Sequence, residues 1–156
     1  MRVFLTRGRH PVTWLPGRRA EPREVRRGRG VARAVRVSKR ILVIDDMEYL
    51  RDVQVLVLTE AGYTATAFAT AREALERLPE VVPDLILLDL AMPGMDGRQF
   101  LRRLRATPRW QHVPVIVTTG RAADDMARQS GCDVLPKPFS DSALLDLVRR
   151  RLGEAA

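Results

Sequence analysis

The chain has 156 residues, of which 46% are hydrophobic, a length that suits one well-packed domain rather than two. Its formal net charge of +8 is unevenly distributed. Residues 1–38 contain eleven arginines and two glutamates, a net of +9, whereas residues 39–156 contain sixteen basic and seventeen acidic residues, a net of −1. The basic character belongs to the N-terminal segment and does not indicate what the rest of the chain binds.

Two absences narrow the class of protein further. The single cysteine, Cys132, excludes an intramolecular disulfide and a cysteine-rich metal site, which fits a reducing cytosol. No apolar run approaches the roughly 20 residues of a membrane span, and the arginine-rich N-terminus lacks the apolar core of a secretory signal. The sequence therefore predicts a cytoplasmic protein without a membrane segment.

Residues 1–38 show no sustained helical or strand periodicity and are rich in arginine, glycine and proline. Such a segment buries too little apolar surface to offset the entropy lost on ordering, so we expect it to be disordered.

From residue 40 onward, short apolar or β-branched runs alternate with stretches of helical length. The runs are ILVI (41–44), YTATA (63–67), DLILLD (84–89), VPVIVT (113–118) and CDVLP (132–136). Five strands separated by helices indicate repeated βα units. Because ILVI and LILL are apolar on both faces, we predict a doubly wound α/β fold, a parallel (βα)5 sheet covered by helices on each side.

The expected helices carry start and stop signals. Gly62 ends the first helix, Thr70 and Glu73 form a capping box before the second, and Pro79 ends it. Asp96 is expected to begin the third helix. The predicted buried faces consist of Leu50, Val53, Val57 and Ala61 in the first helix and Leu144, Val148 and Leu152 in the last.

Polar side chains gather at the carboxyl ends of the predicted strands, where open α/β sheets bind ligands. They are Asp45 and Asp46 after the first strand, Asp89 at the end of the third, Thr118 and Thr119 at the end of the fourth, and Lys137 after the fifth. Three neighbouring carboxylates repel one another unless a cation joins them, and Mg²⁺ prefers oxygen ligands. A carboxylate can also attack phosphorus to form an aspartyl phosphate. The pattern predicts a magnesium-dependent phosphoryl-transfer site.

The stretches ILVIDD, LILLDLAMPGMDG, PVIVTTG and LPKPF resemble, in order and spacing, the receiver domains of two-component response regulators, across roughly residues 39–152. The resemblance implies a flavodoxin-like sheet with strand order 2-1-3-4-5. It also implies a role for each matching residue. Asp89 is the expected phosphoacceptor, Thr119 the switch hydroxyl and Lys137 the family's lysine, followed by a cis bond to Pro138.

The resemblance implies one Mg²⁺ ion bound by Asp45, Asp46, Asp89 and the backbone carbonyl of Ala91. Asp46 is expected to bind the metal directly, and Asp45 mainly through metal-bound water.

Two features depart from the family pattern. The segment between Thr119 and Lys137 is about one helical turn shorter than in well-known receivers, so a short fourth helix is expected. Val134 stands where many members carry a Tyr or Phe that moves with the threonine. We therefore expect little aromatic rearrangement on activation.

The implied function is a stand-alone phosphorylation switch. It would take phosphate from a sensor histidine kinase or phosphotransfer protein and then dock on a downstream protein or relay the phosphate. It would catalyse only its own phosphorylation and dephosphorylation. Because only residues 153–156 follow the last helix, no DNA-binding output domain is expected.

Residues 1–38 have two interpretations. Because the family's domain normally begins a few residues before the first strand, VSKRILVIDD from Val37 reads as a natural start, which would make the preceding segment a mis-assigned start. A real arm would instead bind nucleic acid weakly and without sequence preference. A nucleic-acid-binding protein using this arm is thus one alternative function.

A second alternative function is a phosphatase of the haloacid dehalogenase type, but that family needs an acid where this chain has Ala91.

Overall fold

The computed structural model describes residues 38–120 and 131–154, which lie within one compact unit, Arg36–Ala156. The N-terminal segment 1–37 and the expected short fourth helix in 121–130 lie outside the described residues, as do residues 155–156.

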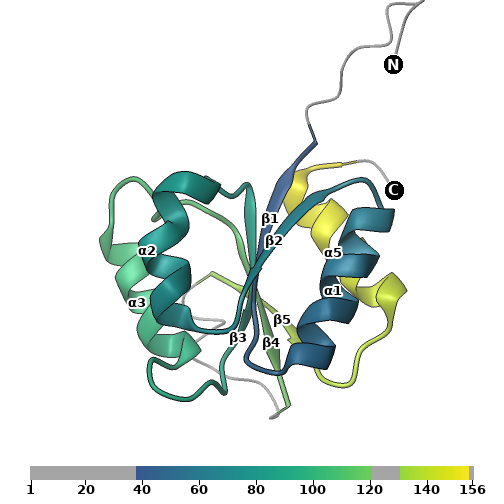
Figure 1. Cartoon of the computed structure of the whole chain (residues 1–156). Coiled ribbons are helices and arrows are strands. Elements are labelled where there is room, and N and C mark those ends of the chain that lie inside the picture. The colour runs from purple at the N-terminus through teal and green to yellow at the C-terminus, as the bar shows by residue number, and fades with distance from the viewer. Residues whose placement is uncertain (1–37, 121–130, 155–156) are drawn as a thin grey trace, which may run out of the picture. The chain divides into compact units, whose positions relative to one another are not determined.

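Five parallel strands form one sheet in the order β2-β1-β3-β4-β5 (Figure 1). They are β1 (Arg40–Ile44), β2 (Thr64–Phe68), β3 (Leu85–Asp89), β4 (Val115–Thr119) and β5 (Asp133–Pro136). The two strands that are buried along their whole length, β3 and β4, lie inside the sheet, as continuous apolar runs require. The predicted fold class and strand order are confirmed.

The described helices cover both faces of the sheet. In Figure 1, α2 (Ala71–Val81) and α3 (Gly97–Ala106) lie on one face, and α1 (Glu48–Glu60) and α5 (Asp141–Leu152) lie on the other. Alternate residues of β1 enter different cores: Leu42 and Ile44 pack with α2 and α3, whereas Ile41 and Val43 pack with α1 and α5. None of the helices in the described ranges is long and apolar enough to cross a membrane.

The predicted buried face of α1 was wrong by one position. Gln54 and Leu58 are its buried residues, whereas the predicted Leu50, Val53, Val57 and Ala61 are half buried. Of these four, Val57 and Ala61 still pack against the core. A glutamine in the middle of the buried stripe disguised its position, because polar residues are normally assigned to the solvent face.

The helix boundaries follow most of the predicted signals. Thr70 and Asp96 cap α2 and α3, each accepting a hydrogen bond from the backbone N–H three residues later. However, Pro79 does not end α2, which continues to Val81 and stops at Val82 in the left-handed conformation. A proline near the end of a helix removes one backbone hydrogen bond, and the buried face of α2 holds the last turn in place.

Candidate functional site

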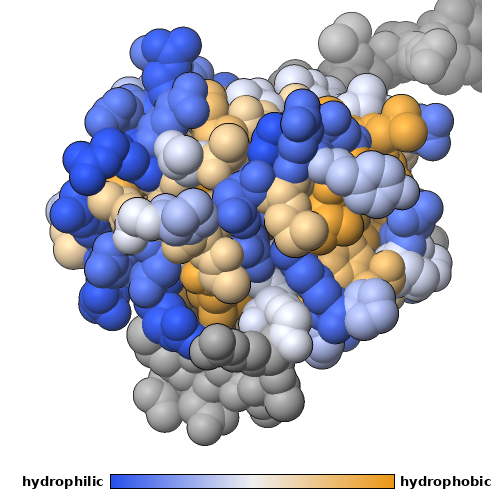
Figure 2. Space-filling model, turned by 60° about the horizontal axis from the view of Figure 1, so that its bottom comes forward, coloured by the Kyte–Doolittle hydropathy of each residue, from blue (hydrophilic) through white to orange (hydrophobic). Residues whose placement is uncertain are grey.

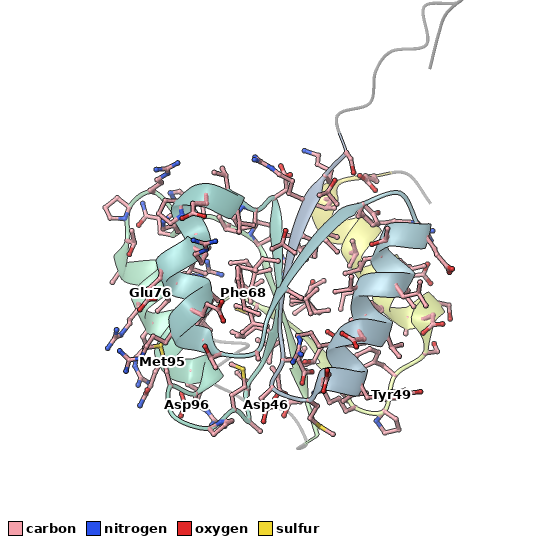
Figure 3. All side chains as sticks on the ribbon, in the orientation of Figure 1. Asp46, Tyr49, Phe68, Glu76, Met95 and Asp96 are labelled. Carbon is pink, nitrogen blue, oxygen red and sulfur yellow. The ribbon has the colours of Figure 1, made fainter. Side chains whose placement is uncertain are left out.

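The sheet register brings the predicted acidic residues together at one edge. Ile44 of β1 pairs with Leu88 of β3. The residues that follow them, Asp45 and Asp89, therefore lie side by side where the two strands end. One ligand oxygen from each of Asp45, Asp46 and Asp89 lies within 4.8 Å of the others. Figure 3 shows Asp46 at this end of the sheet.

The three acids differ in burial. Asp45 has no exposed surface and Asp89 is 4% exposed, whereas Asp46 is more accessible. A carboxylate as buried as Asp45 or Asp89 needs a partner if it is to stay charged.

Lys137 supplies that partner to both buried acids. Its Nζ lies 2.9 Å from Asp45 Oδ2 and 3.2 Å from Asp89 Oδ1. The segment after β5 places the lysine there: its backbone N–H donates to the Thr119 carbonyl oxygen at 2.7 Å, and its bond to Pro138 is cis, as expected. The ammonium group is therefore shared between carboxylates from two neighbouring strands.

Asp45 receives further hydrogen bonds from the start of α1. The Met47 N–H donates to Oδ1 at 3.0 Å, and Gln54 Nε2 donates to Oδ2 at 3.3 Å. Arg51 binds the Asp45 backbone carbonyl at 2.9 Å. Neither Gln54 nor Arg51 was singled out from the sequence. No signal in the sequence pointed to Gln54, because the predicted buried face of this helix did not include Leu58, one turn later.

Burial and charge shift two pKa values in the cluster. Burial raises the pKa of Asp89, Lys137 lowers it in part, and the nearby Asp45 and Asp46 raise it again. Burial disfavours the charged form of Lys137, but its hydrogen bond and charge interactions with Asp45 and Asp89 outweigh burial and raise its pKa. Lys137 therefore remains protonated, and Asp89 ionises less readily than an ordinary carboxyl group.

The end of β4 contributes two buried threonines. Thr118 and Thr119 are 1% and 4% exposed, and Thr119 borders a cavity of about 500 Å³ that Ala91 and Gly120 also line. Within the described residues, the Thr118 hydroxyl oxygen has no hydrogen-bond partner. Thr119, the predicted switch residue, thus lines a cavity whose wall also includes Leu90, the residue directly after Asp89.

The chemistry of the cluster fits a divalent cation. Three carboxylates face one ammonium group, which leaves excess negative charge among oxygen atoms close enough to share one ion. Asp45, Asp46 and Asp89 are the residues that could hold Mg²⁺. Ala91 has no side-chain ligand and could add only its backbone carbonyl.

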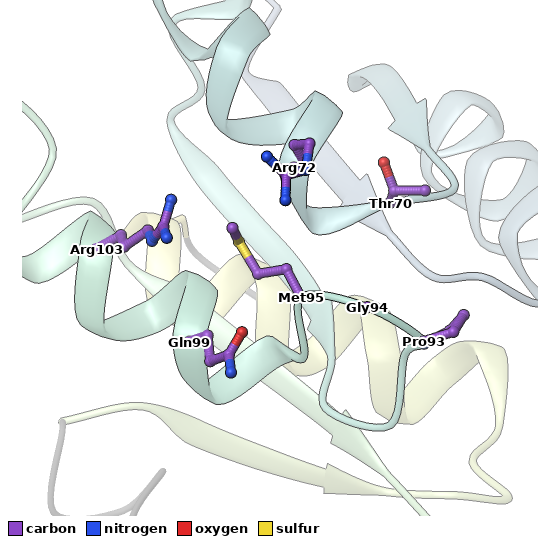
Figure 4. Close-up of a pocket in the computed structure, with 7 residues that line it drawn as sticks. All are labelled: Thr70, Arg72, Pro93, Gly94, Met95, Gln99 and Arg103. Atoms are coloured by element: carbon purple, nitrogen blue, oxygen red, sulfur yellow. The ribbon is translucent and has the colours of Figure 1, made fainter.

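A separate hollow of about 310 Å³ lies between α2, α3 and the loop that follows β3 (Figure 4). Arg72 reaches it from α2 and Arg103 from α3, above the buried side chain of Met95. None of the acidic cluster residues lines this hollow.

Of four residues outside the cluster, three are buried or half buried and one is exposed. Cys132 is buried in the core and His112 is exposed. Trp110 is buried beneath the Arg109 guanidinium group, 4.5 Å from the ring centroid, and so offers no stacking surface for bases. Val134 is half buried against the core that contains α2 and α3.

Comparison with known proteins identifies the family to which this chain belongs. Residues 41–149 match the model of the response regulator receiver domain. The chain belongs to the response regulator receiver family. Receiver domains act in phosphorylation-based two-component signalling, interact with histidine kinases and generally bind Mg²⁺.

Individual relatives agree with this assignment. The chain is 37% identical to the DNA-binding transcriptional regulator NtrC of Escherichia coli over 116 residues, which cover 72% of this chain and 24% of NtrC. It is 36% identical to the DNA-binding response regulator MtrA of Mycolicibacterium paratuberculosis, over 74% of this chain and 52% of MtrA. The chain therefore matches about a quarter of the length of NtrC and about half of the length of MtrA.

A solved structure has the same fold. The chemotaxis response regulator CheY4 of Vibrio cholerae superposes with a TM-score of 0.69 at 27% identity, over 73% of this chain and 98% of that one.

Proposed function

We propose that the chain is a phosphorylation switch that accepts a phosphoryl group on Asp89 from the phosphohistidine of a sensor histidine kinase or phosphotransfer protein. The observation that carries the proposal is the single cluster formed by Asp45, Asp46, Asp89 and Lys137 at the sheet edge. Catalysis would be limited to the protein's own phosphorylation and dephosphorylation, and no metabolite would be a substrate.

In the proposed reaction an oxygen of Asp89 attacks phosphorus and forms a P–O bond as the P–N bond to the donor histidine breaks. The electron pair of the broken bond stays on the ring nitrogen, which takes up a proton. Lys137, already 3.2 Å from Asp89, donates to an oxygen of the transferred group, and the Thr119 hydroxyl would donate to another. Mg²⁺ bound by the three aspartates would offset the negative charge of the phosphoryl oxygens.

The surface beside the cluster supports docking of a protein donor. Met47 directly follows the two aspartates and is 56% exposed. Tyr49 and Leu56, further along the chain, are 77% and 57% exposed. Figure 2 shows apolar surface on the side of the molecule where α1 lies. A partner that buries these side chains would bring its phosphohistidine next to Asp89.

The test uses a small phosphodonor, because the reaction requires only the cluster. Acetyl phosphate or phosphoramidate with Mg²⁺ should add one phosphoryl group, measured by intact-protein mass spectrometry, and Asp89→Ala should abolish the addition. Asp141→Ala, an exposed acid at the start of α5, is the control and should be phosphorylated normally. Labelling that persists in Asp89→Ala, or that is undiminished by EDTA, would contradict the proposal.

A further inference from the structure

Gln54 is a buried polar side chain on a helix face that otherwise packs through apolar groups. It is 3% exposed and lies one helical turn before the fully buried Leu58. An apolar side chain would fill this position without the desolvation that an amide requires. A break in the apolar pattern at a buried position indicates a functional constraint when the polar group has a specific partner.

The partner of Gln54 is the Asp45 carboxylate. Asp45 Oδ2 accepts hydrogen bonds from both Gln54 Nε2, at 3.3 Å, and Lys137 Nζ, at 2.9 Å. The two donors differ in one respect. Lys137 also contacts Asp89 Oδ1 at 3.2 Å, whereas the Gln54 amide comes from α1 and is directed at Asp45.

We propose that Gln54 is a positioning residue that holds the Asp45 carboxylate in place when Lys137 turns toward the phosphoryl group on Asp89. This inference rests on the proposed function. Phosphorylation adds negative charge at Asp89 and so attracts the Lys137 ammonium away from Asp45. An uncharged amide on a helix does not follow that charge, and it keeps one donor on Asp45 Oδ2.

The Gln54 amide would therefore affect how tightly the site binds Mg²⁺ and how fast Asp89 is phosphorylated. Without it, Asp45 Oδ2 relies on Lys137, and releasing the lysine would leave this fully buried carboxylate oxygen with no donor among the described residues. The Asp45 carboxylate would also lose an anchor for its orientation toward the metal. Loss of such supporting hydrogen bonds typically weakens metal binding or activity by about 10–100-fold.

The test removes the amide while keeping the length of the side chain. Gln54→Met should bind Mg²⁺ about ten-fold more weakly by isothermal titration. Its phosphorylation by phosphoramidate should also be slower at saturating Mg²⁺. Because the buried Asp45 Oδ2 loses one of its two donors, the resistance of Gln54→Met to urea should fall. Gln54→Leu also lacks the donor, and we expect the same results from it.

Leu58→Val is the matched control on the same helix. It trims a fully buried side chain in the core formed with α5, so it should lower stability while leaving Mg²⁺ affinity and phosphorylation rate unchanged. Natural Mg²⁺ affinity and natural phosphorylation rate in Gln54→Met would overturn the inference. The proposed function fails separately, if the natural protein itself is not phosphorylated on Asp89.

Discussion

Gly97, the first residue of α3, packs directly against the backbone of Asp89. A Cβ atom on Gly97 would lie 2.8 Å from Leu90 Cα and closer still to the Asp89 carbonyl oxygen. The Gly97 N–H donates to the Leu90 carbonyl at 3.2 Å. The start of α3 is thus seated on the end of β3 that carries the proposed phosphoacceptor.

Replacing Gly97 with alanine should destabilise the domain by about 1–3 kcal/mol, because the methyl group meets backbone atoms that cannot turn aside. Urea unfolding measures the change. Gly120→Ala is the control, since a Cβ there meets nothing within 4 Å among the residues that the structure describes, and it should change stability by less than about 0.5 kcal/mol. Equal effects of the two substitutions would contradict the close packing.

Asp89→Asn should stabilise the metal-free protein at neutral pH. Burial raises the pKa of Asp89 above its ordinary 3.8, so the folded state holds the proton more tightly than the unfolded state. The ionised side chain therefore lowers stability progressively as pH rises from the ordinary value through the raised one. Urea unfolding in EDTA should show the advantage of Asp89→Asn at neutral pH and its decline as pH falls toward 3.8. A difference in unfolding stability between the two proteins that stays constant across this pH range would refute the raised pKa of Asp89.

Asp46→Ala should weaken Mg²⁺ binding more than Asp45→Ala, because the resemblance to receiver domains implies that Asp46 binds the metal directly. Asp45→Ala should instead cost more folding stability, since it removes the fully buried partner of Lys137 and Gln54. Calorimetric Mg²⁺ titration and urea unfolding of both variants separate the two effects. Equal Mg²⁺ losses would argue against different roles.

Tyr63 should ionise late in an alkaline titration. Its hydroxyl donates to Glu154 Oε2 at 2.6 Å, and burial, this hydrogen bond and the Glu154 charge raise its pKa to about 12. Glu154→Gln should lower that pKa, as followed by tyrosinate absorbance in a Tyr49→Phe background, which leaves one tyrosine.

The same shift makes folding stability depend on alkaline pH. The neutral phenol is favoured in the folded state, so its contribution is intact below pH 10.0 and is lost as pH rises toward about 12. Tyr63→Phe should show a weaker loss of stability over this interval. An identical pH profile in the two proteins would count against the Tyr63–Glu154 contact.

A chain shortened to begin at Val37 should fold and accept phosphate like the full chain, because the strands, the cluster and the family match all lie beyond that residue. Circular dichroism and the phosphoramidate assay test this. Failure of the shortened chain to fold would place the domain boundary earlier than residue 38. If residues 1–38 occur in the native protein, their net +9 should give weak binding to nucleic acid that disappears as salt rises.

Local patterns in the sequence were sufficient to predict the fold and the members of the acidic cluster. Strands that are apolar on both faces can be stable only inside a covered parallel sheet, and such a sheet gathers its carboxyl ends at one edge. Asp45 and Asp89 are therefore expected at the same edge from the sequence alone. The same local reasoning failed for the buried stripe of α1 and for Pro79, where packing outweighed residue preference.

Only the tertiary structure decided how the cluster is held. Lys137 is 92 positions from Asp45 and 48 from Asp89, and its sharing between them depends on the register of four strands, β1, β3, β4 and β5. The donor role of Gln54 likewise depends on how α1 lies against the sheet. Hydrogen bonds and close backbone contacts require atoms within a few tenths of an ångström of their places, a precision that residue type and spacing do not carry.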